Sequence, residues 1–397
     1  MNTLTMRELT KFAIGGGWGA EESDKDTQKV MVIRGADFPA AALQDLSSIP
    51  TRFEKSSKVS NRALNPGDIV LEISGGTKDR PTGRTVFITQ KMVDDAASPL
   101  IPASFCRRLV IDSDKADPRF VYYWLQNMYA TGQTWNYQNR STGIANFQFE
   151  QFLDREKVYL PDRQMQLTTS MLLGTLDDKI AANSRIIKIA THLNIKLVEK
   201  AVTKELEHLQ NLADITMGSS PKGEFLNEEG IGEPFFQGVR DFGELFPSER
   251  VFAEKAVRTA QEGDILFAVR APIGEVNIAE HPCVIGRGIA AIRGKQSHLG
   301  LFYLLKGHPE LWETYQSSGT VFAGINKSDL HNAVIPVLRD SEKLEQQLTP
   351  IHERAMHALR ENQVLARTRD ELLPLLMSGR ITVGEAADVA GMAASES

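Results

Sequence analysis

The loop at residues 74–84 combines backbone breakers with positive charge. Four glycines or prolines stand there among the cations Lys78, Arg80 and Arg84. Glycine lets a backbone approach a phosphate closely, and Lys or Arg side chains can then contact phosphates or base edges. The pattern predicts a nucleic-acid contact that includes Gly75 and the three cations. A solvated hairpin loop is the alternative.

A polar and aromatic run follows at residues 135–143. Within it, Asn136, Gln138 and Arg140 carry side chains that can form bidentate contacts with adenine or guanine edges in the major groove. We expect this run to contact bases or the DNA backbone, although a surface loop could have the same composition.

A further glycine-rich loop occupies residues 15–19. Its spacing does not match G-x-G-x-x-G, and no strand-to-helix pattern surrounds it. We therefore expect a turn or a contact with a DNA backbone there, and not a nucleotide-phosphate site.

The chain repeats its own pattern of elements. Gly67-Asp68-Ile69 is echoed by Gly263-Asp264-Ile265, and the loop at residues 269–274 takes the place of the first cationic loop. Each copy closes with an apolar strand and a proline, Pro161 or Pro336, before a long helical pattern. Two diverged copies of one domain-plus-helix unit are the simplest explanation.

Two long helices are expected to position these loops. Apolar residues recur alternately four and three positions apart over residues 161–202 and 342–376, the pattern of helices that pair with another helix. At about 1.5 Å per residue, the first stretch reaches roughly 60 Å. Asparagines interrupt both stripes, and buried polar residues at such positions fix the register. Two ordinary amphipathic helices on separate domains are the alternative. The expected seam comprises Leu176, Ile180, Asn183, Ile187, Leu197, Ile351, Asn362, Leu365 and Leu372.

These patterns divide the chain into two globular domains, two helices and a tail. The tail is rich in Ala, Gly, Glu and Ser, has too little apolar content to pack, and is expected to be mobile. The predicted segments are a domain at 1–160, a helix at 161–204, a domain at 205–338, a helix at 339–381 and the tail at 382–397.

Two motifs on the helices resemble signatures of the specificity (S) subunits of type I restriction–modification systems. The first is Leu173-Gly174-Thr175-Leu176-Asp177-Asp178-Lys179-Ile180, and the second is RTRDELLPLLMSGRI at residues 367–381. The segments before each helix also look like that family's target recognition domains, so the resemblance covers nearly the whole chain.

The resemblance is closest in the second globular domain. Recurring family sequence marks scaffold more than specificity, because the recognised sequence differs between relatives. The cations there are therefore expected to contact the DNA backbone and not to read bases, with an ion pair to Asp241 as the alternative for Arg240. The candidate DNA contacts of this domain are Ser219, Lys222, Arg240, Arg270, Arg287 and Thr320.

The resemblance implies an α+β fold with two pseudo-repeated target recognition domains, joined by two long antiparallel coiled-coil helices. It implies that each domain recognises one half of a split duplex DNA target. It also implies docking of two methyltransferase (M) subunits and of restriction/translocase (R) subunits. S-adenosylmethionine, ATP and Mg are then expected in those partners, with no cofactor, metal or catalytic residue in this chain.

Charge restricts the function further. The 397-residue chain has a net charge of −6; residues 1–160 carry 20 basic and 19 acidic side chains, and residues 205–338 carry 11 and 18. Affinity for duplex DNA comes largely from neutralising phosphates. The acidic balance therefore argues mildly against a stand-alone DNA binder, and we expect partner subunits to supply positive charge.

Sequence motifs of catalysis are absent. The chain has no N-P-P-[FY] or D-P-P-[FY] stretch, no phosphate-binding G-x-x-x-x-G-K-[ST] loop and no H-E-x-x-H. The weaker alternatives are a fused enzyme with an unrecognised motif and a non-catalytic protein-binding scaffold with two similar lobes. Without an apolar run of membrane-spanning length or a signal peptide, a cytoplasmic chain with reduced Cys106 and Cys283 is expected.

Overall fold

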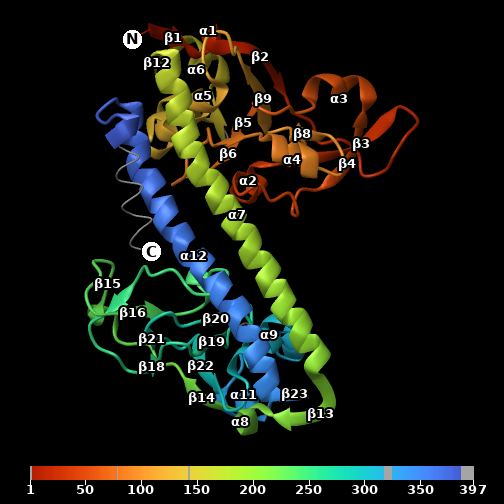
Figure 1. The fold of residues 1–397 in the computed structure, drawn as a ribbon, viewed down its shortest axis with the longest axis vertical. Helices are drawn as coiled ribbons and strands as arrows, with labels where there is room; N and C mark the ends of the chain where they lie inside the picture. Colours follow the sequence, from red (N-terminus) through yellow and green to blue (C-terminus); the bar gives the residue numbers. More distant parts are fainter. Residues whose placement is uncertain (1, 78, 142–143, 317–323, 386–397) are drawn as a thin grey trace. The chain divides into compact units, whose positions relative to one another are not determined.

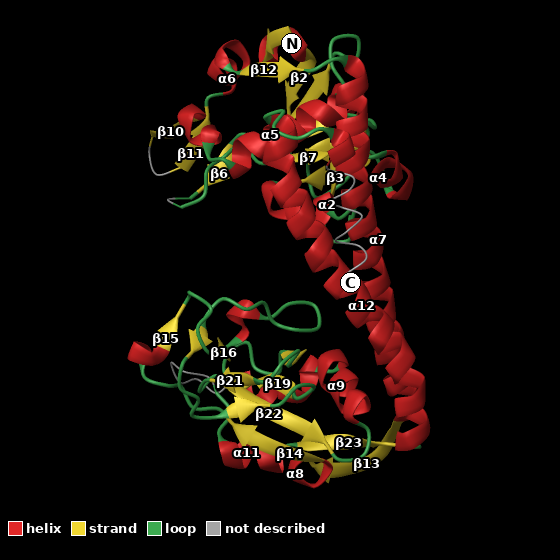
Figure 2. Ribbon diagram, turned by 60° about the vertical axis from the view of Figure 1, so that its left-hand side comes forward, coloured by secondary structure: helices red, strands yellow, loops and turns green. Residues whose placement is uncertain are grey.

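A computed structural model describes residues 2–77, 79–141, 144–316 and 324–385. The chain forms two compact units, a first unit of residues 1–184 with 360–397 and a second unit of residues 185–359. Each unit combines mostly antiparallel sheets with helices (Figure 2), which is the α+β class expected from the sequence. Residues 386–397 of the expected mobile tail lie outside the described residues.

The main sheet of the first unit is antiparallel and buried on both faces. Ile69 and Leu71 pack with Phe120 of helix α5 (Pro118–Ala130), while Val70 between them packs on the opposite face. This alternation follows from the two-residue period of a strand. In spatial order the strands are β2 (Thr10–Gly15), β9 (Cys106–Ile111), β5 (Ile69–Glu72) and β7 (Thr85–Phe87).

A smaller sheet lies beside it in the first unit. Its central strand β3 (Thr27–Ile33) pairs antiparallel with β4 (Thr51–Lys55) and parallel with β8 (Leu100–Pro102). The other first-unit elements are α1 (Met6–Leu9), α2 (Phe38–Ala42), α3 (Ser56–Arg62), β6 (Ser74–Gly76), α4 (Gln90–Asp95), β10 (Gln138–Ser141), β11 (Ile144–Phe147), α6 (Phe149–Arg155), and the 3₁₀ turns η1 (Gly35–Asp37) and η2 (Gln133–Tyr137).

The main sheet of the second unit repeats that of the first. Ile265 and Phe267 pack with Phe302 of helix α9 (His298–Gly307), and Leu266 packs on the opposite face. The strands, again antiparallel, lie in the order β14 (Ala213–Met217), β22 (Ile289–Gly294), β19 (Ile265–Ala268) and β20 (Val276–Ile278).

The smaller sheet of the second unit also contains one parallel pair, β16 (Glu233–Phe236) with β21 (Cys283–Ile285). The remaining second-unit elements are β15 (Leu226–Asn227), β17 (Phe252–Ala253), β18 (Thr259–Ala260), α8 (Leu209–Leu212), α10 (Glu313–Gln316), α11 (Lys327–Asn332), η3 (Gly223–Phe225), η4 (Val239–Asp241) and η5 (Pro309–Trp312).

The repetition extends to single turns. Gly67 and Gly263 both have a positive φ, 92° and 82°, a conformation that glycine adopts without steric cost. The carboxylates of the following residues, Asp68 and Asp264, accept hydrogen bonds from the backbone N–H three positions earlier, at 2.7 and 2.8 Å. The two units are therefore copies of one fold.

Each unit is closed by a two-stranded antiparallel sheet. In the first unit β1 (Asn2–Thr5) pairs with β12 (Lys157–Leu160), and in the second β13 (Val202–His208) pairs with β23 (Val334–Leu338). The strands β12 and β23 directly precede the long helices, so the paired strands fix where each helix begins.

The long helices are α7 (Arg163–Ala201) and α12 (Ser341–Met377), which lie side by side and antiparallel within each unit (Figure 1). In the first unit the amide of Asn183 donates to Glu361 at 2.7 Å, and that of Asn362 donates to Ser184 at 3.1 Å. In that unit the expected seam residues Leu176, Ile180, Asn183 and Leu372 are buried, and Asn362 and Leu365 are half-buried.

In the second unit the same two helices pack around Ile187, which is buried, and Leu197 and Ile351, which are half-buried. Buried Asn194 donates its amide to the Leu348 carbonyl at 3.5 Å. Among the described residues, no helix combines the length and the apolarity that crossing a membrane requires.

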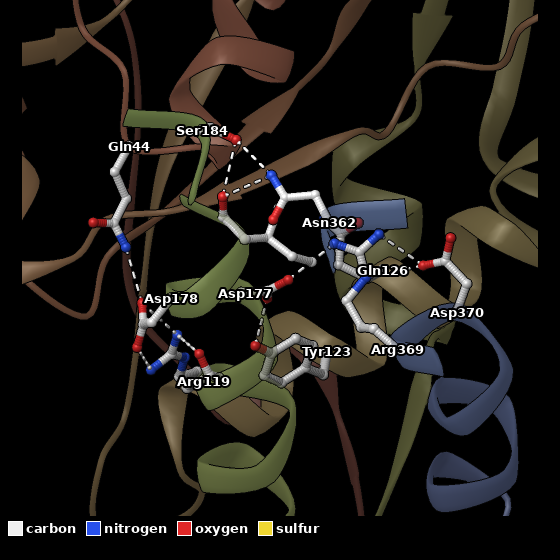
Figure 3. A network of polar contacts seen from close by, with 12 residues as sticks. Gln44, Arg119, Tyr123, Gln126, Asp177, Asp178, Ser184, Asn362, Arg369 and Asp370 are labelled. Atoms are coloured by element: carbon white, nitrogen blue, oxygen red, sulfur yellow. Dashed lines mark hydrogen bonds and ion pairs between the residues drawn. The ribbon is translucent and has the colours of Figure 1, made fainter. Parts of the chain in front are cut away.

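A polar network anchors α7 in the first unit (Figure 3). The Asp177 carboxylate accepts hydrogen bonds from the Tyr123 hydroxyl of α5 at 2.6 Å and from the Arg369 guanidinium of α12 at 2.9 Å. Burial and the neighbouring carboxylate raise the pKa of Tyr123, so its hydroxyl stays protonated as a donor. One carboxylate therefore ties both long helices to the globular part.

The adjacent residues of the same motif complete this anchor. Asp178 accepts a hydrogen bond from Gln44 at 2.9 Å and lies 3.4 Å from the Arg119 guanidinium. Gly174 leaves room for that guanidinium, since a Cβ there would lie 2.4 Å from the Arg119 Cζ. The glycine and the two aspartates of the helix motif thus have a structural explanation.

Candidate nucleic-acid interface

Four loops meet at one end of the main sheet in the second unit. The Ser219 N–H donates to the Ile285 carbonyl and the Val269 N–H to the Gly288 carbonyl, both at 2.9 Å. Gly218 allows this approach, because a Cβ there would lie 2.2 Å from the Gly286 carbonyl oxygen. We call residues 218–220, 237–240, 269–270 and 286–288 the second-unit surface.

Side-chain hydrogen bonds fix the same loops. The Ser220 hydroxyl donates to the Gln237 side-chain oxygen at 2.7 Å and accepts from the Arg287 N–H at 3.1 Å. The structure therefore brings the predicted residues Ser219 and Arg287 together, with Arg240 and Arg270 on the adjoining loops.

The cations of the second-unit surface are exposed to solvent. Arg240, Arg270 and Arg287 are exposed, and Lys222 just beyond them keeps 82% of its side chain exposed. The carboxylate of Asp241 pairs with Arg250 at 3.0 Å, and the ion pair considered for Arg240 is not formed in the described structure. Thr320 lies outside the described residues.

The first unit contains an equivalent surface, residues 16–18, 33–35, 73–75 and 103–105. Two backbone hydrogen bonds of the first unit have counterparts in the second, all at 2.9 Å. The bond from the Gly17 N–H to the Pro102 carbonyl corresponds to that from Ser219 to Ile285. The bond from the Ile73 N–H to the Phe105 carbonyl corresponds to that from Val269 to Gly288. In this alignment Ser74 takes the place of Arg270, and Ser104 takes the place of Arg287. We call these residues the first-unit surface.

Arg84 of the predicted cationic loop is held by a buried carboxylate. Its guanidinium binds Glu72 through two hydrogen bonds, at 2.5 and 2.8 Å, and donates to the Gly35 carbonyl at 2.8 Å. The side chains of Arg84 and Glu72 are 16% and 3% exposed. The hydrogen bond to Glu72 raises the pKa of Arg84 against the effect of burial. The pair is a fixed ionic link beneath the first-unit surface.

The remainder of this loop is more open. Gly75 is exposed with a φ of 123°, and the Arg80 guanidinium donates to the Gly75 carbonyl at 2.7 Å. Lys78 lies outside the described residues. The loop surrounds a hollow of about 620 Å³ lined by Trp18, Arg34, Gly35, Ala36, Glu72, Ser74, Gly75, Arg80, Arg84, Ala103, Ser104 and Phe105.

The polar and aromatic run lies next to this loop. Gln138 in β10 accepts a hydrogen bond from the Thr82 N–H at 2.9 Å and so braces the loop, while Asn136 in η2 is exposed. The strand containing Arg140 pairs with β11, which in turn pairs with β6. The side chain of Arg140 lies outside the described residues.

Sequence reasoning missed three residues of the first-unit surface. Trp18 and Phe105 are large and exposed, and Arg34 binds the buried Asp37 while keeping 40% of its side chain exposed. A signal existed only for Trp18, which stands in the glycine-rich loop. Within the described ranges, no group of three His, Cys, Asp or Glu side chains is placed to hold a metal ion.

The chain is similar in sequence to known DNA specificity proteins. A family model described as the type I restriction modification DNA specificity domain matches residues 202–347. The chain is 26% identical over 300 residues to a protein of Methanocaldococcus jannaschii provisionally named a type I restriction enzyme MjaX specificity subunit, covering 68% of this chain and 70% of that protein.

The fold is also similar to a crystal structure of a type I restriction–modification system S subunit from M. genitalium. The TM-score is 0.61 at 15% sequence identity, over 94% of this chain and 95% of that one. At this identity the similarity establishes the fold.

Proposed function

We propose that this chain, which belongs to the specificity-subunit family of type I restriction–modification systems, recognises a bipartite duplex DNA target with one half read by each unit. Specificity subunits of this family recognise DNA targets and are non-catalytic, with catalysis in partner subunits. For this chain, the proposal adds that the DNA target is divided between the two units.

The observation that carries this proposal is the equivalence of the first-unit and second-unit surfaces. Both use the same strand order and the same backbone hydrogen bonds to bring four loops together. At matching positions, however, the first unit has Ser74 and Ser104 where the second unit has Arg270 and Arg287. A shared scaffold with different side chains fits two readers of two different half-sites.

The distribution of charge supports DNA contact at the second-unit surface. Residues 205–338 carry 11 basic and 18 acidic side chains, yet Arg240, Arg270 and Arg287 are exposed on converging loops. Phosphate contacts fix the position of a protein on a duplex, while base contacts supply specificity. We assign these three cations and Lys222 to phosphate contacts.

In the first unit the roles divide differently. The Arg84–Glu72 pair and Gln138 hold the loop in place, because each side chain is already bonded within the protein. Arg80 and the exposed Asn136 are then the candidates for contact with DNA. Lys78 and Arg140 stay candidates from the sequence.

We further propose that α7 and α12 hold the two units at a fixed separation and offer two similar docking sites to two methyltransferase subunits. R subunits would join the same complex. The acidic balance supports this partnership, since binding strength for duplex DNA depends on phosphate neutralisation. S-adenosylmethionine, ATP and Mg belong to those partners in this proposal.

An exchange of recognition segments tests the division of the target. Residues 15–150 are replaced by the matching segment of a relative, and modified adenines are mapped genome-wide in cells that also contain the methyltransferase subunits. We expect one half of the methylated sequence to change and the other half to persist. The matched exchange of residues 210–330 should change the opposite half, and a joint change of both halves in either exchange would refute independent reading.

A further inference from the structure

The hollow of the first-unit surface carries two exposed aromatic rings. Trp18 is 39% exposed and Phe105 is 65% exposed, and both line the hollow of about 620 Å³. The buried Glu72–Arg84 pair also lines it. Large aromatic side chains gain stability from burial, so two exposed rings around one hollow indicate a ligand with an apolar, planar surface.

The second unit has no aromatic residue at the matching positions. Ser220 takes the place of Trp18, and Gly288 takes the place of Phe105. A Cβ at Gly288 would lie 2.3 Å from the Gln237 carbonyl oxygen, so that position has no room for a ring. The aromatic hollow is therefore a feature of one copy and is not required by the shared scaffold.

Polar groups around the hollow suit a nucleotide. The Arg34 guanidinium binds Asp37 at 2.7 Å and keeps 40% of its side chain exposed. Arg80 also lines the hollow, and its buried Nε has no hydrogen-bond partner among the described residues. Guanidinium groups bind phosphates and base edges, and aromatic faces stack on any nucleobase.

We propose that this hollow takes one nucleobase displaced from the stack of the first half-site. The inference rests on the proposed function, because the DNA must lie on the first-unit surface. Phe105 and Trp18 would stack on the displaced base, and Arg34 and Arg80 would hold its edge or flanking phosphate. Displacing a base costs free energy, which stacking on aromatic side chains offsets. The volume is within the range of small-ligand sites.

The experiment uses the full chain in complex with its methyltransferase subunits. Duplexes carry 2-aminopurine at each position of the first half-site in turn, since its fluorescence rises when the base leaves the stack. We expect a rise of several-fold at one position besides the adenine that is methylated, which the methyltransferase itself displaces from the stack. Phe105→Ala should abolish that rise and weaken DNA binding by about 5- to 150-fold, the range for loss of one base–aromatic stack.

Two variants separate stacking from folding. Phe105→Tyr keeps an aromatic face and should retain most of the signal. Phe12→Ala removes a 40% exposed phenylalanine that does not line the hollow, and should leave both fluorescence and affinity unchanged. Equal losses in the two alanine variants would overturn the assignment of the hollow.

Two other results would also overturn it. If no position other than the methylated adenine changes fluorescence while the half-site is still methylated, the hollow takes no base and the proposed function stands. If Phe105→Ala releases the methyltransferase subunits and leaves the fluorescence rise intact, the hollow holds a protein side chain instead. A complex that does not discriminate the first half-site at all would refute the proposed function as well.

Discussion

Arginines of similar appearance in the sequence have different environments in the two units. Arg84 is 16% exposed and bonded to Glu72, whereas Arg270 and Arg287 are exposed on the second-unit surface. The link to Glu72 depends on β5 pairing with β7, which no local pattern around Arg84 reveals. In the same way, the exposure of Phe105 depends on how the turn before β9 is placed. Sequence could identify cationic loops, and only the fold sorts their side chains into structural and accessible groups.

Replacing an exposed cation should weaken DNA binding without changing the recognised sequence. Arg287→Ala in the complex with methyltransferase subunits is expected to reduce affinity about equally for all sequences and to lower the salt dependence by about one phosphate contact. The matched control is Arg293→Ala, because Arg293 near the far end of β22 is bound to Asp264. Binding titrations at several salt concentrations measure both effects. A relaxed sequence preference would instead show that Arg287 reads a base.

Both cysteines should be unreactive in the folded chain. Cys106 and Cys283 are buried free thiols, and burial raises the pKa of each to about 12. The thiolate is the reactive form, so very little of it is present at pH 8. We expect slow modification by a thiol reagent in buffer and fast modification of both thiols in denaturant. Rapid native labelling at pH 8 would contradict the burial of the labelled cysteine.

At the scale of elements, the long helices were the part most open to sequence reasoning. Helices were expected at 161–204 and 339–381, and the structure has α7 at Arg163–Ala201 and α12 at Ser341–Met377. A long heptad stripe and a preceding proline are local features, which a sequence shows directly. The roles of Gly174 and Asp177 in the motif needed the fold, because Arg119 and Tyr123 come from a distant helix, α5. A motif can thus be recognised before its physical purpose is known.

Two adjacent aspartates of α7 offer a matched test of the helix anchor. Asp177 is 19% exposed and bonded to Tyr123 and Arg369, so Asp177→Ala takes a partner from the buried Tyr123 hydroxyl and leaves the Arg369 guanidinium with the exposed Asp370. We expect a loss of about 2–4 kcal/mol in the free energy of unfolding of the first unit. Asp178→Ala removes a 51% exposed carboxylate that accepts a hydrogen bond from Gln44 and lies 3.4 Å from the Arg119 guanidinium. This loss should cost less than about 1 kcal/mol. Urea titrations that give equal losses would show that Asp177 is not the anchor.

At the scale of the whole molecule, the duplication was visible in the sequence through glycine turns and closing prolines. The full extent of the duplication could not be seen in the sequence. The equivalence of Ser104 with Arg287, for example, follows from matching backbone hydrogen bonds and not from similar residues. Chemically different surfaces on one repeated scaffold are what a reader of an asymmetric, two-part target needs. Under the proposed function, in which each unit reads one half-site, the helices that run through both units would set the spacing between the half-sites.

The most direct test of that proposal lengthens both helices. Seven residues are inserted after Ser184 in α7 and after Leu359 in α12, where the two units divide. A whole heptad keeps the seam in phase. It adds about 10 Å at 1.5 Å per residue, or roughly three base pairs at 3.4 Å each. Three base pairs also rotate the second half-site by about 100° at 10–10.5 base pairs per turn, so overall methylation should fall.

The decisive measurement is methylation by the complex across a library of DNA targets that differ only in spacer length. For the lengthened chain we predict an optimum about three base pairs longer than that of the unmodified chain, with both half-site sequences unchanged. An optimum that stays at the original spacer length would contradict the proposal that one unit reads each half-site and that the helices set the distance between them.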